Sequence, residues 1–214
     1  MRFSDEESRL LGHCIRELEA RTEAEVVLVA RKSSGHYRDV SYLAGAFAAF
    51  TALGIALFSR WVIPALALPV PILAAFWGTA WLTQHSRARV WLTSRRRRSE
   101  QVRKAAYAAF FEKQVHETSA RTGILLYCSR FEKEALILAD HAARERLDQG
   151  KIAELERELA RAGSQARPAR DLAEFLGKFG IYLGRMLPWD EATRGPKKDE
   201  LPDAPSSDDE EDEP

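Results

Sequence analysis

The sequence predicts a mixed α/β domain that is interrupted by a transmembrane α-hairpin and followed by a disordered acidic tail. Three observations lead to this prediction. A 41-residue apolar block contains a single charged residue, Arg60. Short aliphatic runs and amphipathic helical stretches flank this block on both sides. The chain ends in a polar segment that closes with the acidic run DDEEDE. We therefore expect a discontinuous cytoplasmic domain over residues 1–41 and 83–190, a hairpin over 42–82 and a tail over 191–214.

Average composition conceals this division. The 214 residues contain 32 basic and 32 acidic side chains, and 45% of the residues are hydrophobic. These values exclude a collagen and a wholly disordered chain, and two cysteines are too few for a disulfide-rich scaffold. The formal charge of zero combines a tail, 197–214, of net charge −7 with a remainder of +7. Without an overall basic excess, we expect no nucleic-acid partner.

The first 41 residues predict one helix and one strand. Ser4 and Glu7 have the spacing of a capping box, which opens a helix from about Asp5 to Ala20. The run EVVLVA, from Glu25 to Ala30, is typical of a buried strand.

The apolar block has the composition of two membrane spans. Of its 41 residues, 31 are hydrophobic, and it divides near Ser59 and Arg60 into two arms. Each arm has roughly the 20 residues that a helix needs to cross a bilayer. The alternative is a buried hairpin of a soluble helical bundle, but such helices usually keep a polar stripe that these arms lack. Small residues four apart, Gly45 with Ala49 and Ala74 with Gly78, would let the arms pack closely.

Basic residues on both flanks predict the topology. Three precede the block, six follow it, and the turn between the arms has only Arg60. The positive-inside rule then places both termini in the cytoplasm, as in a two-span protein of the cell inner membrane. The four arginines of the following run could also bind anionic lipid, or could act only as a topology determinant. They are Arg95, Arg96, Arg97 and Arg98.

The second half of the chain completes the domain. A region rich in helix formers is followed by Thr122-Gly123, two apolar runs and two amphipathic segments. The short polar connection between the runs favours a β-hairpin. We expect helices over 87–120 and 151–162, strands over 124–128 and 135–139, and a last helix from Pro168 to the residue before Pro188.

Two stretches of the sequence, taken together, resemble the TPM-domain family. The first is LEARTEAEVVLVARKSSGHYRDV, from Leu18 to Val40, directly before the hairpin. The second is RTGILLYCSRFEKEALILADHAARERL, from Arg121 to Leu147. The chain is similar to the branch of that family in which a two-helix membrane hairpin interrupts the domain. The resemblance implies a TPM-like α/β sandwich with a small central sheet.

The resemblance also implies possible functions. Members of the family are associated with acid phosphatase activity, with calcium binding and with the assembly or repair of membrane complexes. Many have a glycine-rich stretch after the second strand that ends in an aspartate. Asp148 matches that aspartate here, but the glycines are absent.

The residues themselves offer one candidate metal site. Asp140 and His141 follow a predicted strand, and with Glu145 and Asp148 they form an oxygen-rich cluster that could bind a hard cation such as calcium. We take Asp140 and Asp148 as the candidate ligands. The alternative is an acidic helix start, in which aspartate serves as the N-cap. Arg130, in the connection between the two strands, could contact an anion or could be a solvated turn residue.

Common catalytic signatures are missing from the sequence. It contains no GxxxxGK[ST], GxGxxG, GxSxG or HExxH. Cys14 and Cys128 lie on apolar faces without metal-ligand spacing, which favours a role as small buried hydrophobic residues. We therefore expect a non-enzymatic membrane adaptor, or an assembly or maintenance factor for membrane partners. It would lie in the lipid bilayer, and its cytoplasmic domain and acidic tail would bind unidentified protein partners. The alternative is a metal-assisted acid phosphatase that uses a metal-bound water.

Overall fold

The computed structural model describes residues 3–35, 37–59, 64, 67–85, 93–165, 168–189, 201 and 205–207. The chain divides into two compact units. The first, the α/β domain, combines Met1–Ser34 with Ser99–Pro214, and the second, the hairpin unit, is Gly35–Arg98. The mixed α/β class predicted from the sequence is confirmed.

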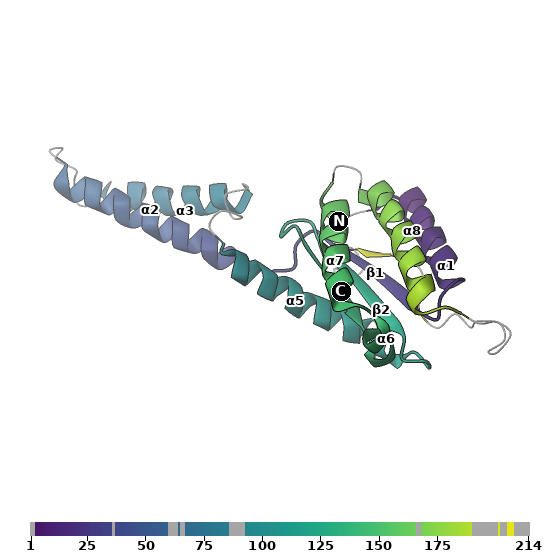
Figure 1. Ribbon diagram of the computed structural model, residues 1–214. Coiled ribbons are helices and arrows are strands. Elements are labelled where there is room, and N and C mark those ends of the chain that lie inside the picture. Colours follow the sequence, from purple (N-terminus) through teal and green to yellow (C-terminus); the bar gives the residue numbers. More distant parts are fainter. Residues whose placement is uncertain are drawn as a thin grey trace. The chain divides into compact units, whose positions relative to one another are not determined.

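Short helices and strands alternate along the α/β domain (Figure 1). In chain order they are α1 (Asp5–Glu19), β1 (Glu25–Arg31), α5 (Arg95–Glu112, whose first turn belongs to the hairpin unit), η2 (Val115–Glu117), β2 (Gly123–Ser129), β3 (Glu134–Ala139), α6 (His141–Arg146), α7 (Gln149–Ser164), α8 (Pro168–Met186) and β4 (Ser206–Ser207). The predicted capping box of α1 is confirmed, since the Glu7 N–H donates to Ser4 Oγ and the Ser4 N–H to Glu7 Oε2.

The sheet has the strand order β3-β2-β1-β4. β1 and β2 are parallel, with Glu25 opposite Gly123 and Arg31 opposite Ser129. β2 and β3 are antiparallel, which confirms the predicted β-hairpin. Because β1 and β2 pair in parallel, the segment between them is a crossover connection, and the hairpin unit is inserted into it before α5.

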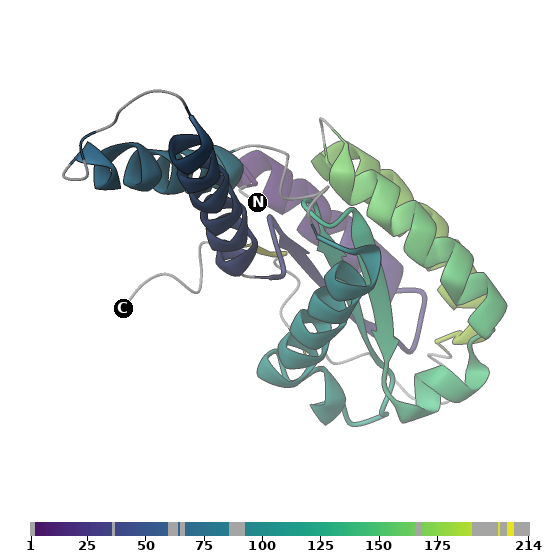
Figure 2. The ribbon, with the colours of Figure 1, turned by 90° about the vertical axis from the view of Figure 1, so that its left-hand side faces the viewer.

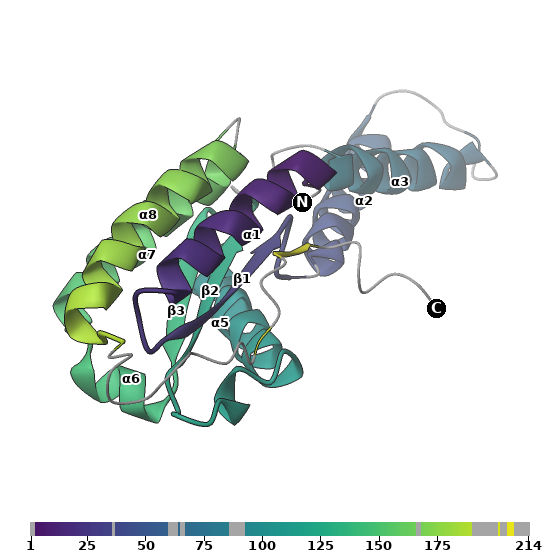
Figure 3. The same cartoon turned by 90° about the vertical axis from the view of Figure 1, so that its right-hand side faces the viewer.

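Helices cover both faces of the sheet, so both central strands are buried throughout. Figure 2 shows α5 (teal) on the opposite side of the strands from α1 (purple), and Figure 3 shows α7 and α8 beside α1. Val26, Leu28 and Leu126 belong to the core on the side of α1, α7 and α8. Val27 and Leu125 belong to the core beneath α5. Such two-sided burial explains why β1 and β2 have continuous rather than alternating apolar runs.

Several helix boundaries differ from the prediction, and α5 begins at Arg95 rather than at residue 87. The helix expected over 87–120 ends at Glu112, because Gln114 adopts a left-handed conformation with φ of 53°. Val115 is nevertheless fully buried, but in the short helix η2. The six-residue helix α6 was not predicted, and α7 extends beyond 151–162 at both ends.

The hairpin unit contains α2 (Arg38–Phe58) and α3 (Pro69–His85), which pack against each other. Gly45 permits the close approach, since a Cβ atom there would lie 2.8 Å from the Phe76 carbonyl oxygen. Tyr42 stacks on Phe76 across the same interface, with ring centroids 6.5 Å apart. Gly78 has no neighbouring atom within 4 Å of a built Cβ, so the predicted contact through Gly78 is wrong.

Of the two membrane spans expected from the sequence, only the first has a helix of sufficient length and apolarity in the part of the chain that the structure describes, and the transmembrane hairpin stays a prediction. Within the described ranges, one helix, Asp39–Phe58, is long and apolar enough to cross a membrane. With 21 residues, α2 is about 31 Å long, whereas the 17 residues of α3 span only about 25 Å. α3 begins at Pro69, so Pro69 and Pro71 lie in its first turn, where proline removes no helical hydrogen bond. The expected turn at Arg60 and Trp61 lies outside the described residues.

One part of the C-terminal tail is ordered against the sheet, contrary to the expectation that 191–214 is disordered throughout. Ser206 and Ser207 form β4, which pairs in parallel with Val29 and Ala30 of β1. Leu201 packs against the core beneath α5, and Pro205 is buried. The physical reason is the open edge of β1, whose backbone groups can pair with any extended segment that reaches them. The DDEEDE run lies outside the described residues.

Candidate functional site

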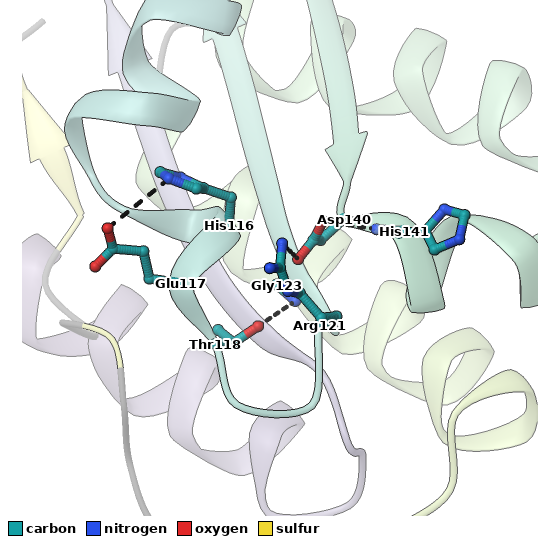
Figure 4. A network of polar contacts seen from close by, with 7 residues as sticks. All are labelled: His116, Glu117, Thr118, Arg121, Gly123, Asp140 and His141. Atoms are coloured by element: carbon teal, nitrogen blue, oxygen red, sulfur yellow. Dashed lines mark hydrogen bonds and ion pairs between the residues drawn. The ribbon is translucent and has the colours of Figure 1, made fainter.

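Asp140 lies where β3 ends and β2 begins (Figure 4). Its backbone N–H donates to the Gly123 carbonyl, and its Oδ1 accepts the His141 N–H at 2.7 Å, which caps α6. Oδ2 is buried and has no hydrogen-bond partner in the described part of the chain. The nearest cation is Arg121, whose Nη1 lies 4.0 Å from Oδ2. The predicted alternative role of Asp140 as an N-cap is thus confirmed.

The loop facing Asp140 is held by the close contact between η2 and β2. Arg121 has a left-handed backbone, with φ of 55°. The Gly123 N–H donates to Thr118 Oγ1 at 3.2 Å, and Thr122 Oγ1 donates to the Glu23 carbonyl at 2.7 Å. A Cβ atom on Gly123 would lie 2.0 Å from the Val115 carbonyl oxygen. The Thr122-Gly123 pair is therefore a packing requirement of this loop.

The two histidines of this region occupy different environments. His116 packs edge-on against the Phe111 ring at 5.1 Å, and its Nε2 lies 3.8 Å from Glu117 Oε1. His141 is exposed, with its Nε2 3.4 Å from Glu145 Oε1. Figure 4 shows the His141 ring turned away from His116. The histidines therefore do not converge on one site.

Asp148 caps a different helix from Asp140. Its Oδ1 accepts the Gly150 N–H at 2.8 Å at the start of α7, and its own N–H donates to the Tyr182 hydroxyl at 3.1 Å. Among the described residues there is no group of three His, Cys, Asp or Glu side chains that could hold a metal ion. Calcium takes six to eight oxygen ligands, so these two aspartates by themselves do not fit a calcium site. Their role as ligands stays a prediction without geometric support.

A second polar network, which the sequence analysis missed, lies at the carboxyl ends of β1 and β2. Glu132 is 3% exposed, and its carboxylate accepts the Ser34 N–H at 3.0 Å and hydroxyl hydrogen bonds from Ser33 and Ser129. The Ser34 hydroxyl also shares a 2.8 Å hydrogen bond with Tyr127, and burial raises the pKa of Tyr127 to about 12. A carboxylate with this many donors acts as a structural link. It joins the turn between β2 and β3 to the end of β1, directly before the chain leaves the α/β domain.

Arg130 is exposed beside this network. Its backbone N–H donates to the Arg31 carbonyl, and the Phe131 N–H donates to the Lys32 carbonyl. The exposed side chain is consistent with a solvated turn residue, the alternative considered for it from the sequence.

A carboxylate also lies at each edge of the three-stranded part of the sheet, buried in the case of Glu19 and half-buried in the case of Glu156. Glu19 of α1 accepts the Val26 N–H of β1 at 2.7 Å. Glu156 of α7 accepts the Ile137 N–H of β3 at 3.0 Å, and burial raises the pKa of Glu156. Each side chain satisfies a backbone donor that has no further strand beside it.

Both cysteines are free thiols whose pKa values are raised. Cys128 is buried in the core, and burial raises its pKa to about 12. The pKa of Cys14 is also raised, mainly by burial and secondly by the charge of Glu17. The predicted role as a small buried hydrophobic residue is confirmed for Cys128, whereas Cys14 is only half-buried.

The arginine run forms the first turn of α5. Ser94 Oγ accepts the Arg97 N–H, and the Arg97 guanidinium forms an ion pair with Asp39 of α2. Arg95 and Arg96 are exposed. Four cations in a first helical turn oppose the helix dipole, so a bound anion would be favourable here.

Comparison with known proteins adds evidence about the fold. No protein-family model matches the chain, and no curated protein sequence matches it. Among solved structures, the chain is similar to the NMR structure of the BA42 protein from the psychrophilic bacterium Bizionia argentinensis. The TM-score is 0.57 and the sequence identity 15%, over 97% of this chain and 96% of that one. At this identity the similarity shows a shared fold and nothing about activity.

Proposed function

We propose that the chain is a TPM-like integral membrane protein whose α/β domain acts as a non-enzymatic adaptor, or as an assembly or maintenance factor, for membrane partners. One observation carries the membrane part of this proposal. The outward side chains of α2 and α3 are large, apolar and exposed, including Phe47 at 77%, Phe58 at 91% and Trp77 at 61%. An exposed apolar surface of this extent on two packed helices is typical of contact with lipid.

The topology of the sheet supports an even number of membrane crossings. The chain leaves the domain after β1 and must return to pair β2 with β1 in the same sheet. If α2 crosses the bilayer, a second segment has to cross back, and α3 with the residues before it is the apolar segment available. The basic flanks then place the domain and both termini on the cytoplasmic face of the inner membrane.

The start of α5 is the proposed contact for anionic lipid. Its four consecutive arginines, Arg95 to Arg98, follow the end of α3 at His85 after residues 86–94. Near a membrane surface each such residue contributes about 1 kcal/mol of attraction to anionic headgroups.

Membrane insertion is tested by placing two charges in the middle of α2. We expect Phe47→Arg combined with Phe50→Arg to move much of the protein out of the membrane fraction, because each arginine costs about 2.5–3.5 kcal/mol at a helix centre. The measurement is the fraction that sediments with membranes after an alkaline wash. Leucine at the same two positions is the matched control and should sediment like wild type. A wild-type protein that washes off completely would contradict insertion.

The adaptor role rests on how the polar side chains of the domain are used. Asp140, Asp148 and Glu132 each accept hydrogen bonds that cap a helix or link a strand end. No observation of the described residues favours the metal-assisted phosphatase alternative. The test is affinity purification from detergent, with and without the tail from Lys197 onward. We expect defined protein partners to co-purify in stoichiometric amount with the full chain, while purified protein leaves phosphomonoesters intact. Hydrolysis that needs calcium or magnesium and is lost in Asp148→Ala would reverse this conclusion.

A further inference from the structure

A groove follows the outer edge of β3. The pocket in it has a volume of about 200 Å³ and lies between α5 on one face of the sheet and the start of α7 on the other. Most of its lining side chains are apolar, but polar and apolar surface share its wall about equally. The lining residues are Tyr107, Phe110, residues 137–139, Arg144, Leu147, Gln149 and Ile152. In Figure 3, β3 lies at the side of the sheet away from β4. The groove therefore coincides with an edge at which a further strand could pair.

The backbone of β3 presents its hydrogen-bonding groups to this groove at alternate residues. The Asp140 N–H points inward and donates to the Gly123 carbonyl of β2. The Ile137 N–H points outward and donates to Glu156. Since the direction alternates along an antiparallel strand, Ala139 shares the outward direction of Ile137. The outward-facing backbone groups of Ile137 and Ala139 could therefore pair with one short added strand.

Glu156 occupies the position that the carbonyl of an added strand would take. Its carboxylate is partly buried, and this burial raises its pKa. The backbone hydrogen bond that it accepts comes from the Ile137 N–H. A backbone carbonyl could accept the same Ile137 N–H without the cost of burying a charge. Glu156 can therefore be displaced by a strand at little net loss of hydrogen bonding.

The basic residues near the pocket and the strand β4 at the opposite edge indicate what kind of segment would bind here. Arg144 lines the pocket, is exposed, and forms no ion pair with any residue the structure describes. Arg103 and Lys104 precede Tyr107 by four and three residues and so share its side of α5. At the opposite edge, the sheet already accepts an extended segment, β4, from an acidic tail. The groove thus combines a pairing edge, a pocket of mixed polarity that contains several apolar side chains, and basic residues beside it.

We propose that the outer edge of β3 binds an extended acidic segment of a partner protein as an added strand, with an apolar side chain in the pocket and a carboxylate at Arg144. This inference rests on the proposed adaptor function and names the surface through which it acts. Recognition of this kind takes affinity from main-chain hydrogen bonds and specificity from the pockets beside the edge.

The test uses the full-length protein in detergent and a random 12-residue peptide library as the probe. Enriched peptides are synthesised, and their binding is measured by fluorescence anisotropy. We expect them to combine β-branched or aromatic residues with Asp or Glu, and Arg144→Glu to weaken their binding at least about tenfold, since like charges in an interface repel. Arg130→Glu is the matched control, because Arg130 is exposed at the other end of β3, and it should change binding by less than about twofold. Glu156→Ala should tighten binding, because it removes the competing acceptor; its melting temperature is recorded alongside.

Several outcomes would overturn the proposal. The proposal fails if no peptide is enriched, if the enriched peptides lack acidic residues, or if Arg144→Glu and Arg130→Glu weaken binding equally. It also fails if the protein self-associates and Arg144→Glu abolishes this, because a second copy would then bind at the edge. If protein partners co-purify equally with wild type and Arg144→Glu, the adaptor function stands and the β3 groove is not its surface. If no partner co-purifies while the peptides bind as expected, the groove is a peptide site and the adaptor function fails.

Discussion

Alanine at position 123 is expected to destabilise the domain by about 3 kcal/mol or more, because it places a methyl group against backbone that cannot rotate away. The built Cβ atom lies 2.0 Å from the Val115 carbonyl oxygen and 2.9 Å from Val115 Cγ1. Val115 is itself fully buried and belongs to the core beneath α5, so η2 has no space into which it can move. Thermal unfolding of the detergent-solubilised protein should show a melting temperature lower by about 6–12 °C.

The matched control for Gly123→Ala is Gly177→Ala. Gly177 lies inside α8, is exposed, and has no atom within 4 Å of a built Cβ. Alanine there should stabilise the domain by about 1 kcal/mol, because glycine lowers helix stability by that amount. The two Gly→Ala changes should thus have opposite signs. A melting temperature for Gly123→Ala equal to that of wild type would contradict the close contact between η2 and β2.

Loss of the Glu132 carboxylate should have an effect of similar size. In Glu132→Ala the Ser34 N–H and the Ser129 hydroxyl lose their shared acceptor inside the protein, and hydrogen bonds to a charged group contribute about 1.5–3 kcal/mol each. We expect the free energy of unfolding to fall by about 3 kcal/mol or more. Hydrogen exchange should also accelerate at the Ser34 amide, at the point where the chain leaves the domain.

Glu134→Ala is the control for this change. Glu134 lies two residues further on and accepts one exposed hydrogen bond, from the Ser99 hydroxyl at 2.8 Å. Its loss should cost less than about 1 kcal/mol. Equal effects of Glu132→Ala and Glu134→Ala would show that the buried network does not stabilise the end of β1.

The main elements of the fold could be predicted because their signals are local. EVVLVA and ILLYC are continuous apolar runs because β1 and β2 are covered on both faces, and the capping box of α1 needs only Ser4 and Glu7. The helices η2 and α6 were missed because three and six residues are too few to show a helical period.

The polar networks could not be predicted because their partners are distant in sequence. Glu132 and Ser34 are 98 positions apart, and Glu156 meets Ile137 only after α7 has packed on the sheet edge. In the sequence these carboxylates are indistinguishable from surface residues. Asp140 and Asp148 were chosen as candidate metal ligands because of their positions after a strand or before a helix. Aspartate is also the preferred residue for a helix N-cap at such positions, so the sequence alone could not separate the two roles.

The place of the hairpin within the crossover connection sets the order of events during synthesis. Glu25 of β1 and its partner Gly123 of β2 are separated by 98 positions, which take about 5–20 s to translate. Throughout that time β1 is a finished strand without its neighbour, with two apolar faces and an unpaired edge. The domain can close only after the apolar block has left the ribosome. Under the proposed function, insertion of this block into the membrane therefore comes before sheet formation, and a failure of insertion should leave an aggregation-prone N-terminal segment.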